Sequence, residues 1–208
     1  MTLIVHHLEN SRSQRILWLL EELALPYEIR RYERHKATSL APPALKAIHP
    51  LGKSPMIEDD GQVIIETGAI VEYLVEKADG RMGPGAHRES LLRYRQYLHY
   101  AEGSMMPPLF AMLVVGRIPL FGKSALKRLR PMLDVHLDFL EAELASRPWF
   151  AGDAISAADV MMSFPLEAAR ARAGLDESRP ATIAWLDTIH ARPAYQAALA
   201  KGGPYAYA

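Results

Sequence analysis

The sequence contains no cysteine among its 208 residues. A disulfide framework, a thiolate metal site and a redox cycle on the chain's own thiols are therefore excluded. Any thiol chemistry would have to use a thiol that a ligand brings to the protein. The histidines show no spacing with Asp or Glu that is typical of a metal site, so we expect no bound metal.

The sequence also lacks an excess of either charge and a long apolar run. Lysine plus arginine (24) balance aspartate plus glutamate (24), which argues against binding to nucleic acid or to an anionic membrane. No apolar run approaches the roughly 18 residues that span a membrane, and the N-terminus lacks the basic region of a secretion signal. We therefore expect a cytoplasmic protein that contacts neither nucleic acid nor membrane and recognises its ligand locally.

Residues 49–77 organise the first part of the chain. Residues 55–65 are predicted to be two short strands joined by an Asp-Asp-Gly turn at residues 59–61. Pro55 is tolerated as the first residue of a strand, and the Ser54–Pro55 bond is a candidate for a cis peptide. Glu66 and Thr67 then open a helix, whose free N–H groups can hold a ligand carboxylate.

The order of the predicted elements indicates a mixed α/β sheet with helices on both faces. Strands at residues 3–5 and 27–32 alternate with helices at 11–25 and 44–48, before the stretch just described. Residues 79–87 are rich in Gly and Pro, and the strand signals stop after them. We therefore predict an α/β domain over residues 1–78, a linker over 79–87 and an all-helical domain over 88–208.

The second domain is predicted to contain several helices of different length. The longest covers residues 89–115, interrupted near Gly103 and bent at its two adjacent prolines. Ser156 and Asp159 form a capping box at the start of another helix. Pro165 is expected to bend this helix. The remaining helices are predicted at residues 124–144, 180–190 and 193–200, and Pro131 should lie near a turn or kink the first of them.

Four short motifs resemble glutathione S-transferases. Residues 52–55 (Gly-Lys-Ser-Pro) and 65–70 (Ile-Glu-Thr-Gly-Ala-Ile) are similar to the thioredoxin-like half of that family. Residues 149–152 (Trp-Phe-Ala-Gly) and 156–159 (Ser-Ala-Ala-Asp) are similar to its helical-domain motif. The resemblance covers essentially the whole chain and is closest to the fungal and bacterial branch that uses neither Cys nor Tyr at the start.

This resemblance implies a fold, an activity and an assembly. The fold would be a thioredoxin-like βαβαββα domain followed by an all-α domain. The activity would be the transfer of the glutathione thiolate to an electrophilic, largely apolar small molecule, as in detoxification, and the assembly would be a homodimer. The same thiolate could serve glutathione-dependent reduction of organic hydroperoxides, and a non-catalytic binding or regulatory module of this fold is the alternative from another class.

The resemblance also implies how glutathione would bind. Glu66 would take the γ-glutamyl ammonium and Thr67 the adjacent carboxylate, while Ser54, before Pro55, would pair its main chain with the cysteinyl backbone. The cationic candidates for the carboxylates are Lys53, His35 and Lys36. The alternatives are that Glu66 and Thr67 simply start a helix and that the three cations are solvated.

Ser11 is the predicted catalytic residue. It falls where the serine-using members of the family place their catalytic hydroxyl, which donates a hydrogen bond to the glutathione sulfur and favours the thiolate. Asn10 is the rival donor. His6 stands near the position of the catalytic tyrosine in other members, which closes that route. The alternative is that Ser11 caps the first helix and Ser13 is solvated.

The site for the second substrate is less well defined. The predicted long helix carries aromatic and methionine side chains that suit apolar, variable ligands. These candidates are Tyr97, Tyr100, Met105, Met106 and Phe110. An apolar stripe at helical spacing can equally consist of ordinary core residues.

Overall fold

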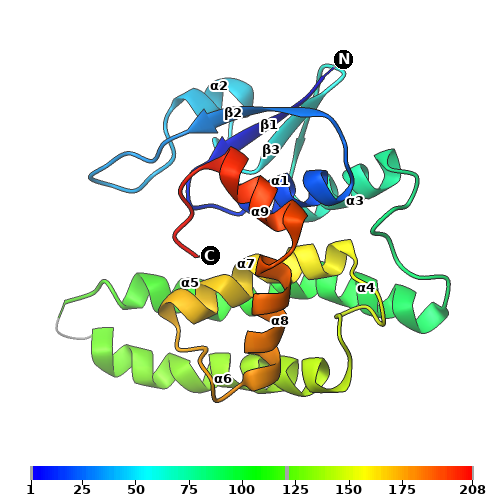
Figure 1. Ribbon diagram of the computed structural model, residues 1–208. Helices are drawn as coiled ribbons and strands as arrows, with labels where there is room; N and C mark the ends of the chain where they lie inside the picture. Colours follow the sequence, from blue (N-terminus) through cyan, green and yellow to red (C-terminus); the bar gives the residue numbers. More distant parts are fainter. Residues whose placement is uncertain (1, 120–121, 208) are drawn as a thin grey trace. The chain divides into compact units, whose positions relative to one another are not determined.

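The computed structural model describes residues 2–119 and 122–207, which divide into two compact units. The first unit contains residues 2–83 together with His190–Ala206, and it holds the sheet (Figure 1). The second, the helical unit, contains Pro84–Ile189 together with Tyr207. A thioredoxin-like α/β fold followed by helices, as predicted from the sequence, is confirmed.

The sheet has four strands in the order β2-β1-β3-β4. They are β1 (Leu3–Leu8), β2 (Tyr27–Tyr32), β3 (Met56–Asp59) and β4 (Gln62–Ile65). β1 is parallel to β2 and antiparallel to β3, and β3 is antiparallel to β4. Val5 is paired with Ile29 on one side and Ile57 on the other, and the buried side chains of Val5 and Ile57 mark the centre of the sheet.

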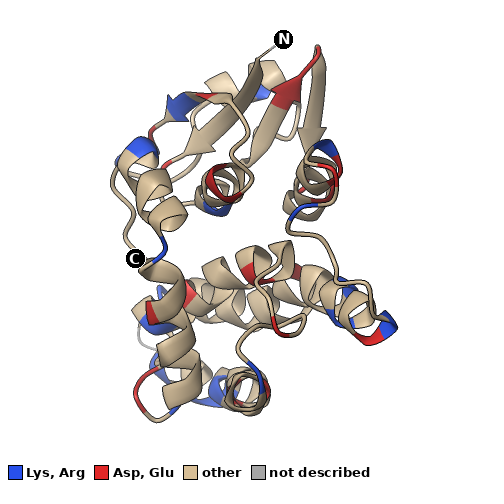
Figure 2. Ribbon diagram, turned by 45° about the vertical axis from the view of Figure 1, so that its right-hand side comes forward, with Lys and Arg blue, Asp and Glu red and all other residues tan. Residues whose placement is uncertain are grey.

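The hairpin between β3 and β4 follows the sequence signal closely. Asp60 (φ 48°) and Gly61 (φ 79°) both have positive φ, as the two central residues of a tight hairpin turn require. The predicted cis peptide at Ser54–Pro55 is present. β3 begins at Met56, one residue later than predicted, because proline has no N–H to offer the neighbouring strand. The acidic end of this hairpin is red in Figure 2.

Four helices belong to the first unit: α1 (Ser13–Glu22), α2 (Ala44–Ile48), α3 (Thr67–Lys77) and α9 (Pro193–Gly202). α1 packs against β1 and α3. Its residues Ile16, Leu17 and Leu20 are fully buried, as their helical spacing predicts. α1 starts at Ser13 and ends at Glu22, and is shorter at both ends than the predicted helix.

The last helix, α9, packs on α1. Trp18 and Tyr195 meet edge to face with ring centroids 5.4 Å apart. Arg192 Nε donates to Glu22 Oε1 at 2.5 Å, which adds a charge-assisted bond to this contact. Its contacts thus group α9 with the first unit, whereas the sequence analysis predicts one helical domain over residues 88–208.

The helical unit contains the elements predicted for it. They are α4 (Arg88–Tyr100), a π-helical turn η1 (Ala101–Met105), α5 (Met106–Val115), α6 (Gly122–Ser146), α7 (Ala157–Arg172) and α8 (Pro180–His190). The predicted interruption near Gly103 is the π-helical turn itself. Pro107 and Pro108 lie in the first turn of α5, where a missing N–H is tolerated, whereas Pro131 and Pro165 lie inside α6 and α7.

The predicted capping box at the start of α7 is confirmed and extends further than expected. Asp159 Oδ2 accepts hydrogen bonds from Ser156 N (2.9 Å) and Ser156 Oγ (3.1 Å). Asp159 Oδ1 accepts one from Phe150 N at 3.0 Å, which fixes the preceding loop to the helix. Asp159 is fully buried, and burial raises its pKa to about 6.

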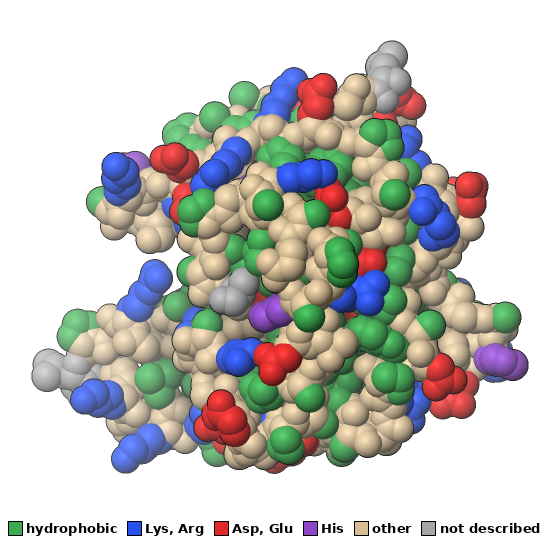
Figure 3. All heavy atoms as spheres, in the orientation of Figure 1, with side chains coloured by type: hydrophobic (Ala, Val, Ile, Leu, Met, Phe, Trp, Pro, Cys, Tyr) green, Lys and Arg blue, Asp and Glu red, His purple; other side chains and the backbone are tan. Residues whose placement is uncertain are grey.

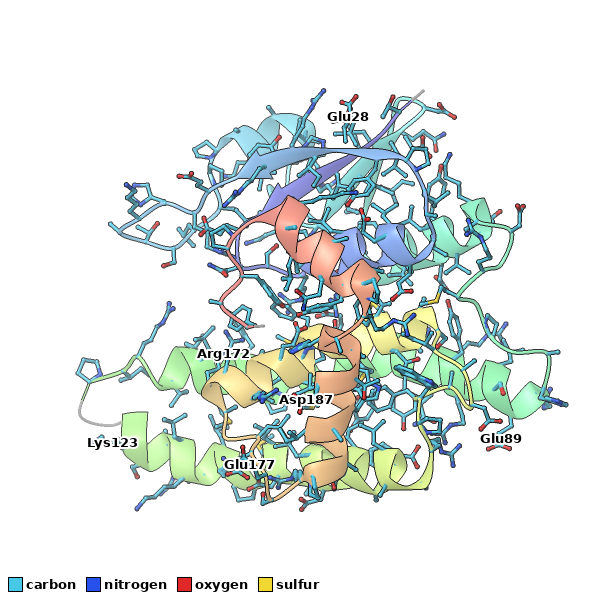
Figure 4. All side chains as sticks on the ribbon, in the orientation of Figure 1. Glu28, Glu89, Lys123, Arg172, Glu177 and Asp187 are labelled. Atoms are coloured by element: carbon cyan, nitrogen blue, oxygen red, sulfur yellow. The ribbon has the colours of Figure 1, made fainter. Side chains whose placement is uncertain are left out.

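An ion pair joins two helices of the same unit. Asp187 of α8 (labelled in Figure 4) pairs with Arg170 of α7 at 3.1 Å.

The surface carries charges of both signs and some exposed apolar side chains. Lys/Arg and Asp/Glu are interspersed over the face seen in Figure 3. Within the described part of the chain, we find no helix long and apolar enough to cross a membrane. The large apolar side chains exposed on α5 and α6 are Phe110, Val114, Met132, Val135 and Phe139.

Candidate functional site

Four loops of the first unit meet at one edge of the sheet. Leu8 pairs with Tyr32, His6 with Met56, and Met56 with Ile65. The residues that follow β1, β2 and β4 therefore lie at the same edge as those that precede β3. This edge collects residues 9–12, 33–36, 52–55 and 66–67, which include every candidate for thiol and glutathione binding that the sequence analysis singled out.

The backbone amide of Leu8, at the end of β1, joins two of these loops. Its N–H lies 3.2 Å from Ser13 Oγ and 3.3 Å from Ser54 Oγ. Ser54 Oγ in turn donates to the carbonyl of His6 at 2.9 Å. The side chain of Ser54 is thus held by β1, directly before the cis peptide to Pro55.

Ser11 and Ser13 form a buried pair at the start of α1. Their hydroxyl oxygens are 2.8 Å apart, and Ser11 Oγ also accepts the N–H of Ser13 at 3.2 Å. Ser11 is 6% exposed and Ser13 fully buried, so the expectation of a solvated Ser13 is wrong. Ser11 Oγ thus accepts the N–H of the first residue of α1, although Arg12 and not Ser11 is the N-cap residue, and the Ser11 hydroxyl still has one proton to donate.

A histidine that the sequence analysis missed lies behind this pair. His7 Nδ1 is 2.9 Å from Ser13 Oγ, and the ring is almost fully buried. Burial and the nearby Arg31 guanidinium lower the pKa of His7 to about 4, so the ring is neutral at pH 7. The two consecutive histidines of β1 point to opposite faces of the sheet. His6 bonds Glu58 (2.6 Å) and Tyr32 (2.9 Å) instead.

Asn10 is held from two sides. Arg34 Nη2 donates to the Asn10 carbonyl at 3.1 Å, and Arg34 Nε donates to the Glu9 carbonyl at 2.9 Å. The backbone N–H of Ala206 donates to Asn10 Oδ1 at 2.7 Å. The φ of Asn10 is 50°, a left-handed conformation that asparagine adopts more readily than most residues. Neither Arg34 nor Ala206 lies near Asn10 in the sequence, so no local pattern announces them.

Glu66 has the least usual backbone conformation of the site. Its φ is 67° and its ψ 121°, which costs a non-glycine residue about 1–3 kcal/mol and is typical of functional positions. Its carbonyl accepts the N–H of Ile70 at 2.9 Å, but among the residues that the structure describes its side chain caps no helix N–H. A simple helix start therefore does not account for the exposed carboxylate. Thr67, the first residue of α3, is buried.

The three cationic candidates are all exposed. Lys53 follows the tight turn at Gly52 (φ 56°) and precedes Ser54. His35 Nδ1 lies 3.3 Å from the N–H of Thr38, which ties its ring to the loop after β2, and Lys36 is next to it. The binding of a glutathione carboxylate by these three residues stays a prediction.

Most of the candidates for the second substrate are packed inside the helical unit. Tyr97 donates to Glu143 Oε2 at 2.7 Å and its ring lies tilted against that of Phe150 with centroids 4.7 Å apart. Both burial and Glu143 raise the pKa of Tyr97. Tyr100 lies 2.6 Å from His136 Nδ1, and burial raises its pKa to about 12. Met105 and Met106 are buried as well. This is the arrangement of ordinary core residues, the alternative that the sequence left open; only Phe110 of the candidates is largely exposed.

The site contains no evident place for a metal ion within the described residues. No three His, Asp or Glu side chains there are grouped so that they could hold one.

Comparison with known proteins gives consistent matches. Residues 1–76 match the family profile described as glutathione S-transferase, N-terminal domain, and residues 104–193 match glutathione S-transferase, C-terminal domain. Glutathione S-transferase 3 of Schizosaccharomyces pombe is 37% identical over 214 residues, covering 96% of this chain and 87% of that protein. Glutathione S-transferase 1 of Saccharomyces cerevisiae is 34% identical over 222 residues, covering 95% and 94%. A solved glutathione S-transferase structure from Actinobacillus pleuropneumoniae is 31% identical, with a TM-score of 0.87 over 97% of this chain and 93% of that one.

Proposed function

Because the chain belongs to the glutathione S-transferase family, we propose that the sheet edge binds glutathione and activates its thiol. The thiolate attacks an electrophilic, largely apolar small molecule. A carbon–sulfur bond forms, the leaving group departs with its electron pair, and the thiol proton passes to solvent. In this proposal Ser11 donates the hydrogen bond that stabilises the thiolate, and Asn10 is the alternative donor.

The observation that carries the proposal is the convergence of Ser11, Ser54 and Glu66 on one edge of the sheet. Ser11 and Ser54 are linked through the Leu8 amide, to which the hydroxyls of Ser13 and Ser54 both lie within hydrogen-bond distance. Glu66 directly follows Ile65, which pairs with Met56, the residue after the cis proline. A tripeptide with a thiol in its middle needs a hydrogen-bond donor for the sulfur, a main chain to pair with and an opposite charge at one end. Ser11, Ser54 and Glu66 can supply these three in turn.

The energetics of thiol activation are within reach of these groups. Lowering a thiol pKa from about 8.5 by roughly two units takes about 2.7 kcal/mol of preferential stabilisation of the thiolate. One charge-assisted hydrogen bond contributes roughly 1.5 to 3 kcal/mol, and a helix N-terminus adds about 0.3 to 1. The Ser11 hydroxyl can supply the first contribution and the N-terminus of α1, which begins at Ser13, the second.

The ends of glutathione would be held by charge and by backbone donors. The exposed Glu66 carboxylate binds the γ-glutamyl ammonium, and Thr67 at the start of α3 binds the adjacent carboxylate. Ser54 pairs its main chain with the cysteinyl residue as an added strand does. Lys53 and either His35 or Lys36 meet the glycyl carboxylate.

The apolar substrate would contact α5 at its exposed side chains. Phe110 (59% exposed) and Val114 (48% exposed) lie one helical turn apart and present one apolar face. They replace the buried Tyr97 and Met105 as our first choice for this role. Flexible and aromatic side chains of this kind suit electrophiles of varied shape.

We also propose that the chain is a cytoplasmic homodimer. Met132, Val135 and Phe139 follow helical spacing on α6 and are 59%, 68% and 39% exposed, an apolar stripe of the kind that a second copy would cover. Light scattering of purified protein should give twice the mass of one chain. Val135→Glu should reduce that mass, whereas Leu40→Glu, a change at a similarly exposed residue in the loop between β2 and α2, should not.

Two experiments separate this proposal from its alternatives. Retention on immobilised glutathione with turnover of aryl halides or epoxides supports the transferase. Turnover of organic hydroperoxides alone points to the peroxidase, in which the thiolate attacks the O–O bond and a second glutathione yields the disulfide. Retention without any turnover indicates a non-catalytic binding module, and failure to bind glutathione contradicts the proposal as a whole.

A further inference from the structure

A chain of three polar side chains lies behind the proposed thiol site. His7 on β1 reaches Ser13 on α1 (Nδ1 to Oγ, 2.9 Å), and Ser13 reaches Ser11 (Oγ to Oγ, 2.8 Å). All three side chains are buried: His7 is 2%, Ser13 0% and Ser11 6% exposed. Ser11 alone belongs to the proposed chemistry, and the other two have no role in it so far.

The tautomer of His7 is set by the end of α9. The ring makes a hydrogen bond with the Gly202 backbone that raises the His7 pKa, as donation to a carbonyl does. Nε2 is the nitrogen on that side, 3.4 Å from the point where a Cβ on Gly202 would stand. A neutral ring holds one proton, so Nε2 carries it and Nδ1 is an acceptor.

The direction of the remaining protons follows from this tautomer. The buried Nδ1 accepts the hydroxyl proton of Ser13, which is its partner at 2.9 Å. The other acceptor within reach of the Ser13 hydroxyl is the Leu8 carbonyl oxygen, which is more distant at 3.2 Å. With its proton given to His7, Ser13 Oγ offers only lone pairs, and it accepts from the hydroxyl of Ser11.

We propose that His7 and Ser13 are positioning residues that hold the Ser11 hydroxyl proton toward Ser13, so that it turns to the glutathione sulfur only when that sulfur is a thiolate. A neutral thiol is a weak acceptor and does not displace the Ser13 oxygen. A thiolate does, because hydrogen bonds to a charged acceptor are roughly twice as strong as neutral ones. This inference rests on the proposed function of Ser11.

The direct test is the pH titration of bound glutathione, followed by the ultraviolet absorbance of the thiolate. Ser13→Ala removes the competing acceptor, so the midpoint should fall by about 0.5 to 1 pH unit, the equivalent of one neutral hydrogen bond. The effect must pass through Ser11. In the Ser11→Ala background, adding Ser13→Ala should therefore leave the midpoint unchanged.

A second variant acts at His7, the far end of the series of three polar side chains. Gly202→Ala would bring a Cβ to 2.6 Å from Gln14 Oε1 and 2.9 Å from Leu17 Cδ1, so either the end of α9 or the tips of these two buried side chains must shift, and a shift of α9 breaks its bond to His7. Nδ1 can then carry the proton and donate to Ser13, and the Ser11 hydroxyl is released. This variant should lower the midpoint in the same direction, again only when Ser11 is present.

Ser163→Ala is the matched control. Ser163 is also a buried serine, and its hydroxyl donates to the Val160 carbonyl at 2.9 Å in α7, so its loss should leave the midpoint at the wild-type value. An unchanged midpoint in both Ser13→Ala and Gly202→Ala overturns the inference, as does a shift that persists without Ser11. Calorimetry keeps the two proposals apart: a protein that does not bind glutathione fails the proposed function, whereas one that binds it and forms the thiolate without these shifts fails only this inference.

Discussion

The backbone N–H of Ala206 donates to the side-chain oxygen of Asn10 at 2.7 Å, across almost the full length of the chain. This bond fixes which way the Asn10 amide faces, because its oxygen must point to Ala206 and its NH₂ group away. Asn10 is thereby presented as a donor beside Ser11, and the two residues compete for the same proposed role.

Single substitutions at these two positions should separate them. We expect Ser11→Ala to bind glutathione within a few fold of wild type but to lose most of its turnover, because the hydroxyl stabilises the thiolate more than the thiol. A shift of one unit in the thiol pKa leaves tenfold less thiolate below that pKa. Asn10→Gly keeps the left-handed backbone accessible and should retain the wild-type thiolate titration.

The reverse pattern would show that Asn10, and not Ser11, stabilises the glutathione thiolate. In that case Asn10→Gly would raise the midpoint of the thiolate titration and Ser11→Ala would not.

Glu66→Ala and Thr67→Ala should each weaken glutathione binding by about 1.5 to 3 kcal/mol, if their hydrogen bonds to the γ-glutamyl end are charge-assisted. Isothermal titration calorimetry measures this directly. Glu66→Ala should leave the melting temperature close to wild type, because the carboxylate is exposed and caps no helix N–H within the described residues. Glu76→Ala, at an exposed glutamate near the other end of α3, is the control. An affinity equal to wild type in either variant would remove that residue from the site.

Asp159→Ala should destabilise the protein by about 2 to 4 kcal/mol, since it removes a helix cap and leaves the N–H groups of Phe150 and Ser156 buried without their acceptor. Chemical denaturation gives this value. Turnover per folded molecule should survive, because Asp159 belongs to the core of the helical unit. Normal unfolding with lost turnover would show that the residue acts in the chemistry instead.

His7 should make the stability of the protein depend on pH. Its pKa is about 4 in the folded protein and 6.5 in the unfolded chain, so the unfolded state alone binds a proton between these values. The contribution of His7 to stability is therefore complete above about pH 6.5 and falls as the pH drops toward 4, by about 3 kcal/mol in all. The difference in unfolding free energy between wild type and His7→Gln should shrink over this window.

Comparison of wild type with His7→Gln separates the effect of His7 on stability from the effects of other titrating groups. Asp159, with its raised pKa, changes stability in the opposite direction over part of the same window, but it is present in both proteins and cancels. A difference between wild type and His7→Gln that stays constant from pH 7 to pH 4 would contradict a buried, neutral His7.

The sequence predicted the elements well where local chemistry decides them. The Asp-Asp-Gly turn required positive φ at residues 60 and 61 and has it, and the serine and aspartate of the capping box meet as their spacing requires. The proline after Ser54 gave both the cis peptide and the approximate start of β3. These features depend on a few neighbouring residues, so a pattern in the sequence can reveal them.

Features that depend on distant contacts could not be read in this way. Nothing near His7 shows that Ser13 and Gly202 surround it, and a histidine in a strand has no typical partner. Asn10 meets Arg34 and Ala206 only through the fold. For Tyr97 the sequence pattern fits a core and a ligand site equally, since aromatic residues suit both, and only the fold shows its burial and its bond to Glu143.

The return of α9 to α1 has a consequence for synthesis of the chain on the ribosome. Residues 2–83 supply all four strands, but the surface of α1 that carries Trp18 and Glu22 meets Tyr195 and Arg192, which come more than a hundred residues later in the chain. At translation rates of about 5–20 residues per second, those partners emerge several seconds or more after residue 83. During that interval the nascent first unit would expose the apolar side of α1, and the intervening helical unit can fold before α9 covers it.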